Sequence, residues 1–309
     1  WAALIRRLKW RFIVAIEGVS AIDCANAASV MALLPGSIRQ FHGTGRHIPV
    51  EGLPIIAVPT TAGTGSEVTN VAVISDREMH RKAPIVSDSF YPRCAVVDPE
   101  LTYSVPAHVT ACTGMDVLSQ AIEGYWSTGH QPICDACAVH ATRLVFRHLA
   151  RAVKDSRNAL ARRMMCEASV TAGLAFSLPK TTAPHACSFP LTEMYGIPHG
   201  EACGLTLDYF IRVNGSDERV QEFARLVGFG DVEELASAVG ELKQSIGLMT
   251  DLGRFHLNEA DVDRLVEKSH HPNLRNNPVA VTDGVLSTLY ESLAVHTAVG
   301  LRVHAGRES

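Results

Sequence analysis

The chain is 309 residues long; 47% of its residues are hydrophobic, 19% are charged, and the formal net charge is −4. These are ordinary values for a globular protein, and the length favours two domains over one. Positive and negative side chains are interspersed without a basic run, which argues against a nucleic-acid partner. No apolar segment is long enough to span a bilayer, so we expect no membrane partner.

The chain begins at Trp1 and contains eight scattered cysteines. A signal-peptide pattern is missing before the first apolar run, and scattered cysteines in a chain of this length are typical of reduced thiols. We therefore expect a cytoplasmic protein without a disulfide framework. Either processing or a fragment would account for the start at Trp1.

The first hundred residues alternate short apolar runs with turn residues, which indicates strands. Strands are predicted at residues 12–16, 54–58, 71–74 and 94–97, with a helix over residues 21–34. Continuous apolar strands separated by a helix favour a parallel sheet of the nucleotide-binding type.

Two turns in this region carry glycine and hydroxyl side chains. The first, Glu-Gly-Val-Ser at 17–20, leads into a helix whose N-terminus can face a phosphate, although many structural turns look alike. The second, at 60–66, is more distinctive, because a structural turn needs neither two glycines nor four hydroxyls. We interpret it as a ligand-binding turn whose glycines allow a close backbone approach; its residues are Thr60, Thr61, Gly63, Thr64, Gly65 and Ser66.

From Pro106 onward the pattern becomes helical. Amphipathic stretches are predicted at 107–126, 132–152, 158–178, 217–228, 232–247, 259–269 and 282–298, with no convincing strand. We therefore predict an α/β nucleotide-binding domain over residues 1–101, followed by an all-α catalytic domain over residues 102–309.

Four polar side chains within the helical part have the chemistry of a metal site. Asp116 and Gln120 are four residues apart, so a helix places them on one face. His185 and His199 lie 14 residues apart (199 − 185 = 14), each near the start of a predicted helix. One Asp and two His with an open position form a Lewis-acid site, but a single histidine is more often a packed core residue.

Other potential metal ligands in the sequence have simpler explanations. Cys134 and Cys137 form one C-x-x-C inside a helical pattern without a second pair, which is a weak zinc signal. His130, His270 and His271 lie in loop-like surroundings, and no special role is assigned to them.

The chain resembles the iron-containing (group III) alcohol dehydrogenases over nearly its whole length. The resemblance rests on IIAVPTTAGTGSE at 55–67, VDPEL at 97–101, TGMD at 113–116 continuing to AIEG at 121–124, GIPHG at 196–200, and more weakly NNP at 276–278. This family implies a dehydroquinate synthase-like architecture, with a dinucleotide-binding domain, a helical domain, and the active site between them.

The resemblance also implies roles for individual residues. Asp116, His185 and His199 would bind a divalent metal, commonly Fe²⁺ and in some members Zn²⁺, with Gln120 auxiliary. NAD or NADP would lie against the Gly18/Ser20 turn, the 60–66 turn and Thr69, and Lys82 would reach the ribose. The activity implied is interconversion of an alcohol and an aldehyde by hydride transfer. We expect a small-molecule substrate and a homo-oligomer.

The sequence departs from the family pattern at several positions. Gln120 and Phe189 stand where most or many members carry histidines, which removes an imidazole ligand and a candidate proton relay. Glu-Gly-Val-Ser at 17–20 replaces a Gly-Gly-Gly-Ser turn, so a carboxylate lies where phosphate approaches. The opening strands and helices of the family are also missing, so the predicted nucleotide-binding domain is truncated at its N-terminus.

Within the family, the motifs are most similar to the phosphonoacetaldehyde reductase branch. A dianionic substrate of that kind needs a cationic partner. Lys180 and Arg275 are the candidates, although both are equally compatible with solvated surface charges. Two alternatives stay open: a truncated or degenerate homologue without catalysis, and a lyase or hydrolase that uses the same cation to activate water.

Overall fold

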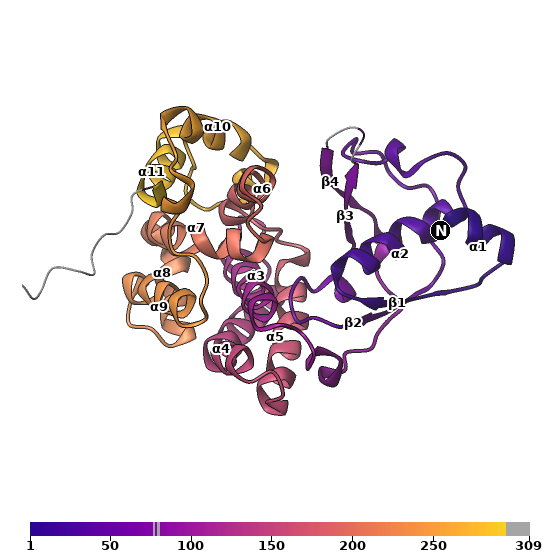
Figure 1. Ribbon diagram of the computed structural model, residues 1–309, viewed down its shortest axis with the longest axis horizontal. Coiled ribbons are helices and arrows are strands. Elements are labelled where there is room, and N and C mark those ends of the chain that lie inside the picture. Colours follow the sequence, from indigo (N-terminus) through magenta and orange to yellow (C-terminus); the bar gives the residue numbers. More distant parts are fainter. Residues whose placement is uncertain (77, 79–80, 295–309) are drawn as a thin grey trace, which may run out of the picture.

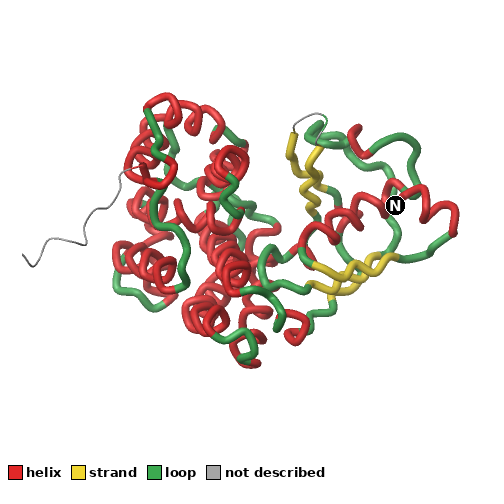
Figure 2. The backbone as a smooth tube through the Cα atoms, in the orientation of Figure 1, coloured by secondary structure: helices red, strands yellow, loops and turns green. Residues whose placement is uncertain are grey.

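A computed structural model describes residues 1–76, 78 and 81–294 of the chain (Figure 1). All its strands lie in the first hundred residues, and long helices form the rest (Figure 2). The α/β part contains α1 (Ala2–Leu8), β1 (Ile13–Glu17), α2 (Val19–Met31), β2 (Ile55–Pro59), β3 (Val71–Asp76), β4 (Arg81–Val86) and β5 (Cys94–Ala95). The helical part contains α3 (Ala107–Trp126), α4 (Pro132–Lys154), α5 (Ala159–Ser177), α6 (Ala183–Tyr195), α7 (His199–Val213), α8 (Glu218–Val227), α9 (Val232–Ser245), α10 (Glu259–Ser269) and α11 (Asp283–Ala294).

The predicted parallel sheet is smaller than expected. It contains three parallel strands in the order β1-β2-β5, with Ala15 paired to Ala57 and Ala57 to Ala95. The predicted strand at 71–74 belongs instead to a separate antiparallel pair, β3 with β4. Assigning it to the parallel sheet was wrong, because the few residues between β3 and β4 allow a hairpin but not a parallel crossover.

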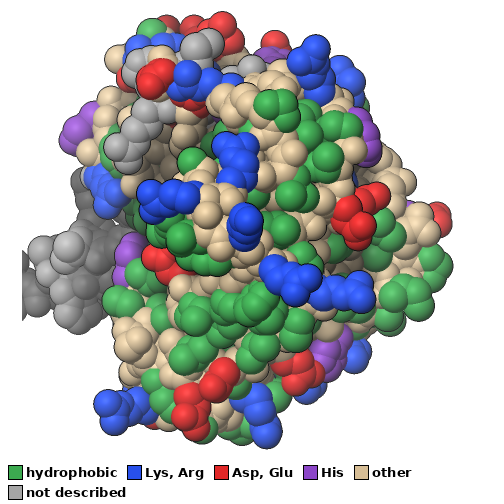
Figure 3. All heavy atoms as spheres, turned by 90° about the vertical axis from the view of Figure 1, so that its right-hand side faces the viewer, with side chains coloured by type: hydrophobic (Ala, Val, Ile, Leu, Met, Phe, Trp, Pro, Cys, Tyr) green, Lys and Arg blue, Asp and Glu red, His purple; other side chains and the backbone are tan. Residues whose placement is uncertain are grey.

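The two faces of the parallel sheet have different surroundings. Ala15 and Ala57 are buried in a cluster with Ile22 and Ala25 of α2. On β1, Val14 and Ile16 are 45% and 62% exposed. Hydrophobic side chains lie among lysines and arginines on the side that the α/β part turns outward (Figure 3). Within the described residues, β1 is therefore not buried on both faces of the sheet, although its sequence is continuously apolar.

Helix α3 is the centre of the helical part. Nearly all of it is buried, and it packs against α4, α5 and α7. The amphipathic pattern did not predict α6 and α7, although a helix start was expected at His185 and another near Glu201. Burial on most sides removes the amphipathic pattern, and α6 also contains Pro190. None of the described helices has the length and apolar character needed to cross a membrane.

The 60–66 loop follows β2 and packs against two helices of the helical part. Gly65 has φ 63°, and a Cβ there would lie 2.6 Å from Cα of Gly173 on α5. A Cβ on Gly63 would lie 2.9 Å from Cβ of Thr113 on α3, and the Gly63 N–H donates to Ser169 Oγ at 2.9 Å. These glycines therefore permit close packing of the loop on two helices. A close approach to a ligand is not needed to explain them.

Replacing Gly65 with alanine is expected to destabilise the protein by roughly 2–5 kcal/mol, because left-handed backbone strain and a clash with Gly173 add together. Gly45→Ala is the matched control, since Gly45 also has positive φ (67°) but no atom within 4 Å of its Cβ position. Denaturant unfolding of both variants measures the difference. Equal losses would contradict the packing explanation.

Candidate metal centre

Asp116 occupies the middle of α3 and is 3% exposed. Its Oδ1 has no hydrogen-bond partner. Gln120 lies one turn later, and its amide oxygen is also buried without a partner. Buried polar atoms are normally paired, so two unpaired oxygens on one helix face fit a site for a cation.

His185, in the first turn of α6, is held by Glu123 of α3. Its Nδ1–H donates to Glu123 Oε1 at 2.5 Å. Glu123 is fully buried, and its other oxygen accepts from the Thr182 N–H at 2.6 Å and the Thr182 hydroxyl at 3.1 Å. A carboxylate only accepts, so Nδ1 carries a proton and Nε2 is left for the site. That Nε2 lies 3.4 Å from Asp116 Oδ1.

His199, the first residue of α7, is oriented in a similar way by Ser188. The Ser188 hydroxyl donates its single hydrogen to the His185 carbonyl at 2.7 Å. Its oxygen therefore accepts from His199 Nδ1, 3.1 Å away. The Nε2 of His199 is then free of that proton and lies 3.8 Å from Asp116 Oδ1. Both imidazoles thus present Nε2 to the same carboxylate oxygen.

Cys203 is a fourth donor that the sequence analysis did not single out. Its Sγ lies 3.9 Å from His199 Nε2, and its side chain groups with Asp116, His185 and His199 as a set of donors able to hold a metal ion. The available signal was its position four residues after His199 on the same helix. Glu123 was likewise quoted only as part of a motif, although it lies seven residues after Asp116, on the same face of α3.

The charges in this cluster shift each other's protonation. Burial raises the pKa of Asp116, but the neighbouring His185 and His199 outweigh burial and lower it. Burial lowers the pKa of His185, but the negative charges of Cys203 and Glu123 outweigh burial and raise it well above its ordinary value. The site therefore favours positive charge at the point where the two Nε2 atoms meet.

Aromatic rings connect the donors to a pocket. The Phe189 ring stacks near His199 at a centroid distance of 6.1 Å and contacts His271 at 4.8 Å. A pocket of about 630 Å³ is lined by His271 and Arg275, together with His270, Pro272, Leu274, Asn277, Pro278, Ala280 and Val281. Lys180 is different, because its Nζ donates to the Ser177 carbonyl at 2.6 Å. Of the two predicted cations, Arg275 is the one that lines this pocket.

On the cofactor side, the two predicted turns meet. They follow the adjacent parallel strands β1 and β2, and the Gly18 Cβ position lies 3.5 Å from Thr61 Oγ1. Thr60, Thr61 and Thr64 are half-buried and Ser20 is exposed, whereas Ser66 and Thr69 are buried, Ser66 against the Thr64 hydroxyl at 2.9 Å. Lys82 lies on β4 and pairs with Ser75 of β3, but its side chain is not among those that the structure describes.

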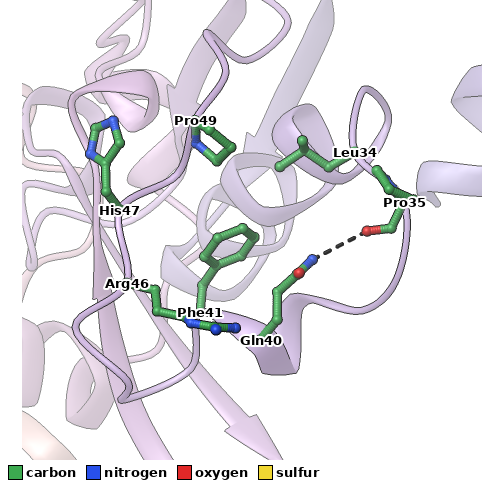
Figure 4. A pocket seen from close by; sticks show the side chains of 7 residues that line it. All are labelled: Leu34, Pro35, Gln40, Phe41, Arg46, His47 and Pro49. Atoms are coloured by element: carbon green, nitrogen blue, oxygen red, sulfur yellow. Dashed lines mark hydrogen bonds between the residues drawn. The ribbon is translucent and has the colours of Figure 1, made fainter.

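Other features lie away from this site or have local partners. The pocket in Figure 4, of about 390 Å³, lies in the α/β part and includes none of the predicted site residues. All eight cysteines are free, including Cys134 and Cys137 on α4. His130 lies 3.1 Å from Asp135, and His270 lies 3.1 Å from Asp283.

Two protein-family models match the chain. One, described as iron-containing alcohol dehydrogenase, matches residues 1–99. The other, described as Fe-containing alcohol dehydrogenase family, C-terminal, matches residues 110–294. The chain therefore belongs to the iron-containing alcohol dehydrogenase family, and the predicted family and its two-part architecture are confirmed.

Individual relatives are alcohol dehydrogenases and aldehyde reductases. Long-chain-alcohol dehydrogenase 1 of Geobacillus thermodenitrificans is 34% identical, over 96% of this chain and 78% of the relative. Sulfoacetaldehyde reductase of Bilophila wadsworthia is 30% identical, over 91% and 76%. The crystal structure of sulfoacetaldehyde reductase from Bifidobacterium kashiwanohense in complex with NAD⁺ is 59% identical, with a TM-score of 0.93 over 95% of this chain and 78% of that chain. These similarities place the chain among oxidoreductases.

Replacing Glu123 with glutamine is expected to weaken binding of a divalent cation about 10- to 100-fold. The NH2 end of the glutamine amide would face either the His185 Nδ1–H or the Thr182 donors, all of which now face carboxylate oxygens. Two donors cannot form a hydrogen bond with each other, so His185 would lose its orientation. Titration of the metal-free protein with Zn²⁺ measures the affinity. Glu222→Gln serves as the control, because Glu222 is exposed and accepts only a 3.4 Å bond from Tyr125. Unchanged affinity in Glu123→Gln would contradict the positioning role.

Proposed function

We propose that this chain is a metal-dependent, NAD(P)-linked reductase of short aldehydes that carry a terminal sulfonate or phosphonate. The convergence of His185 Nε2 and His199 Nε2 on Asp116 Oδ1 is the main support for the chemistry. Similarity to a sulfoacetaldehyde reductase at 59% identity supports the substrate class and favours the sulfonate. Phosphonoacetaldehyde, which would yield 2-hydroxyethylphosphonate, is the second candidate substrate.

In this proposal Asp116, His185 and His199 hold the metal, with Gln120 auxiliary. Fe²⁺ is the first candidate and Zn²⁺ the second, because nitrogen donors and the nearby Cys203 thiol suit both better than Mg²⁺. The metal, when bound, polarises the carbonyl of the aldehyde. Glu123 and Ser188 keep the two imidazoles oriented by accepting from their Nδ1 atoms.

The remaining predicted residues divide between cofactor and substrate. Residues 1–101 would bind the dinucleotide and residues 102–309 would carry the chemistry. Backbone and hydroxyl groups at Gly18, Ser20, Thr60, Thr61 and Thr64 border one edge of the parallel sheet, where dinucleotides bind in α/β folds. Gly63, Gly65, Ser66 and Thr69 would support this edge from inside, because they are buried.

Arg275 is the proposed partner of the anionic end of the substrate. It lines the same pocket as His271, whose ring contacts Phe189 beside His199. A guanidinium forms bidentate hydrogen bonds with sulfonate or phosphonate oxygens. Phe189 would contribute an apolar wall, not a proton relay.

The metal assignment predicts that His199→Ala loses the metal ion held by Asp116, His185 and His199 together with turnover. Metal content and NADH and NADPH binding by fluorescence are measured first on the wild-type chain. Stoichiometric Fe or Zn together with micromolar dinucleotide binding supports a reductase. Metal without dinucleotide binding would favour a non-catalytic homologue or a lyase or hydrolase. An unchanged metal stoichiometry together with unchanged turnover in His199→Ala would overturn the assignment.

The substrate assignment predicts a selective effect at Arg275. Arg275→Gln is expected to lower kcat/KM for sulfoacetaldehyde and phosphonoacetaldehyde about 10- to 100-fold, because one charged hydrogen-bonding partner is lost. Activity on propanal, which has no anionic end, should change little. Arg264→Gln is the control, since Arg264 lies on the exposed side of α10. Equal losses on all three aldehydes would show that Arg275 does not recognise the anion.

A further inference from the structure

A second group of donors lies between α3 and α7, separate from the cluster around Asp116. It contains His108 in the first turn of α3, Cys112 one turn later, and Glu201 in the first turn of α7. Cys112 and Glu201 are 7% and 4% exposed, whereas the His108 side chain is 57% exposed. A cation could therefore reach this group from solvent past the histidine.

The contacts within this group are long. His108 Nε2 lies 3.6 Å from Glu201 Oε2 and 3.6 Å from Cys112 Sγ, and Cys112 Sγ lies 4.0 Å from Glu201 Oε2. An N···O contact of that length is not a hydrogen bond by ordinary criteria. Three potential ligand atoms are thus held near one another, joined only by weak contacts through the Cys112 sulfur.

The same distances are close to those between ligands of one zinc ion. Tetrahedral geometry with normal zinc bond lengths places neighbouring ligand atoms about 3.4 Å apart for N···O and about 3.6 Å apart for N···S and S···O. The largest departure is the S···O distance, 4.0 Å against about 3.6 Å. Small rotations of exposed His108 and of the Glu201 carboxylate would close that difference.

Backbone packing holds two of the three donors in place. A Cβ on Gly200 would lie 2.0 Å from the Cys112 carbonyl oxygen, so only glycine lets the start of α7 approach α3 this closely. Glu201 Oε1 accepts from the Met249 N–H at 2.9 Å, which leaves Oε2 facing Cys112 and His108. Outer hydrogen bonds of this kind orient carboxylate ligands in metal sites.

We propose that His108, Cys112 and Glu201 form a second divalent-cation site, suited to Zn²⁺, with its fourth position open to solvent. A thiolate, a carboxylate and a neutral imidazole carry a total charge of −2, which balances the ion in a mostly buried site. Binding replaces the Cys112 thiol proton, which is released to solvent. The ion would link α3 to α7, the helices that carry Asp116 and His199.

The protonation of Cys112 in the absence of a metal is consistent with replacement of its thiol proton by a cation. Burial and the negative charge of Glu201 raise the pKa of Cys112 to about 12. The thiol is therefore protonated at neutral pH until a cation displaces its proton, and metal uptake at this site should release protons.

The test is titration of the metal-free full chain with Co²⁺ under anaerobic conditions, with bound metal counted by equilibrium dialysis. The wild-type chain and His140→Ala should bind two equivalents. His140 is the matched control, because it is a half-exposed histidine paired with Glu167 and belongs to neither group of three or more potential metal ligands among the described residues. His108→Ala and Cys112→Ser should each bind one equivalent.

A further pair of variants separates this site from the one around Asp116. His199→Ala should keep one equivalent of cobalt together with a thiolate-to-cobalt absorption band, and adding Cys112→Ser should remove both. Circular dichroism is the control that checks whether each variant is folded. A wild-type stoichiometry of one, or two equivalents retained in His108→Ala, would overturn the proposal.

Discussion

The buried carboxylate of Glu123 is the interaction on which the arrangement of the site depends. It lies on α3 without exposure to water and accepts hydrogen bonds from the start of α6, including the one from His185 Nδ1. An unpaired buried carboxylate would cost several kcal/mol, so these donors are required by folding as well as by function. The interaction thus fixes the position of α6 and the tautomer of His185 together.

Close helix packing brings the other donors to the same place. Gly200 allows α7 to approach α3 near Cys112 and Asp116, and Gly65 and Gly173 allow the 60–66 loop to contact α5. A side chain at any of these positions would place at least one methyl group in the interface and push the packed elements apart. Short interhelical distances are therefore what let Asp116, His185 and His199 reach one point.

The buried polar side chains around His185 and His199 fall into two kinds of environment. Glu123 and Ser188 are fully buried, and each accepts a hydrogen bond from one of the two histidines. Asp116 Oδ1 and Gln120 Oε1 are buried but unpaired. Unpaired oxygens lower stability unless a ligand satisfies them, so this part of α3 gives up folding free energy that binding of a cation would restore.

The sequence was sufficient for the long amphipathic helices and for the two glycine-containing turns after β1 and β2. It also singled out Asp116, His185 and His199, which the structure brings together. These features depend on local periodicity and on side-chain chemistry, which are visible in the chain itself. The hairpin of β3 and β4 was assigned incorrectly, and α6 and α7 were missed as periodic ranges. Hairpin pairing depends on loop length and partner strands, and helices buried on most sides lack a polar face.

The role of individual residues required the tertiary structure. From the sequence, the glycines of the 60–66 turn indicated a ligand, whereas packing against Thr113 and Gly173 explains them. Cys203 joins the donors and Arg275 lines the pocket only because segments distant in sequence meet. The chain therefore determined which chemical groups are present and where helices form. Folding decided which of those groups share a site, because contacts between distant segments depend on the packing of whole helices and not on local sequence.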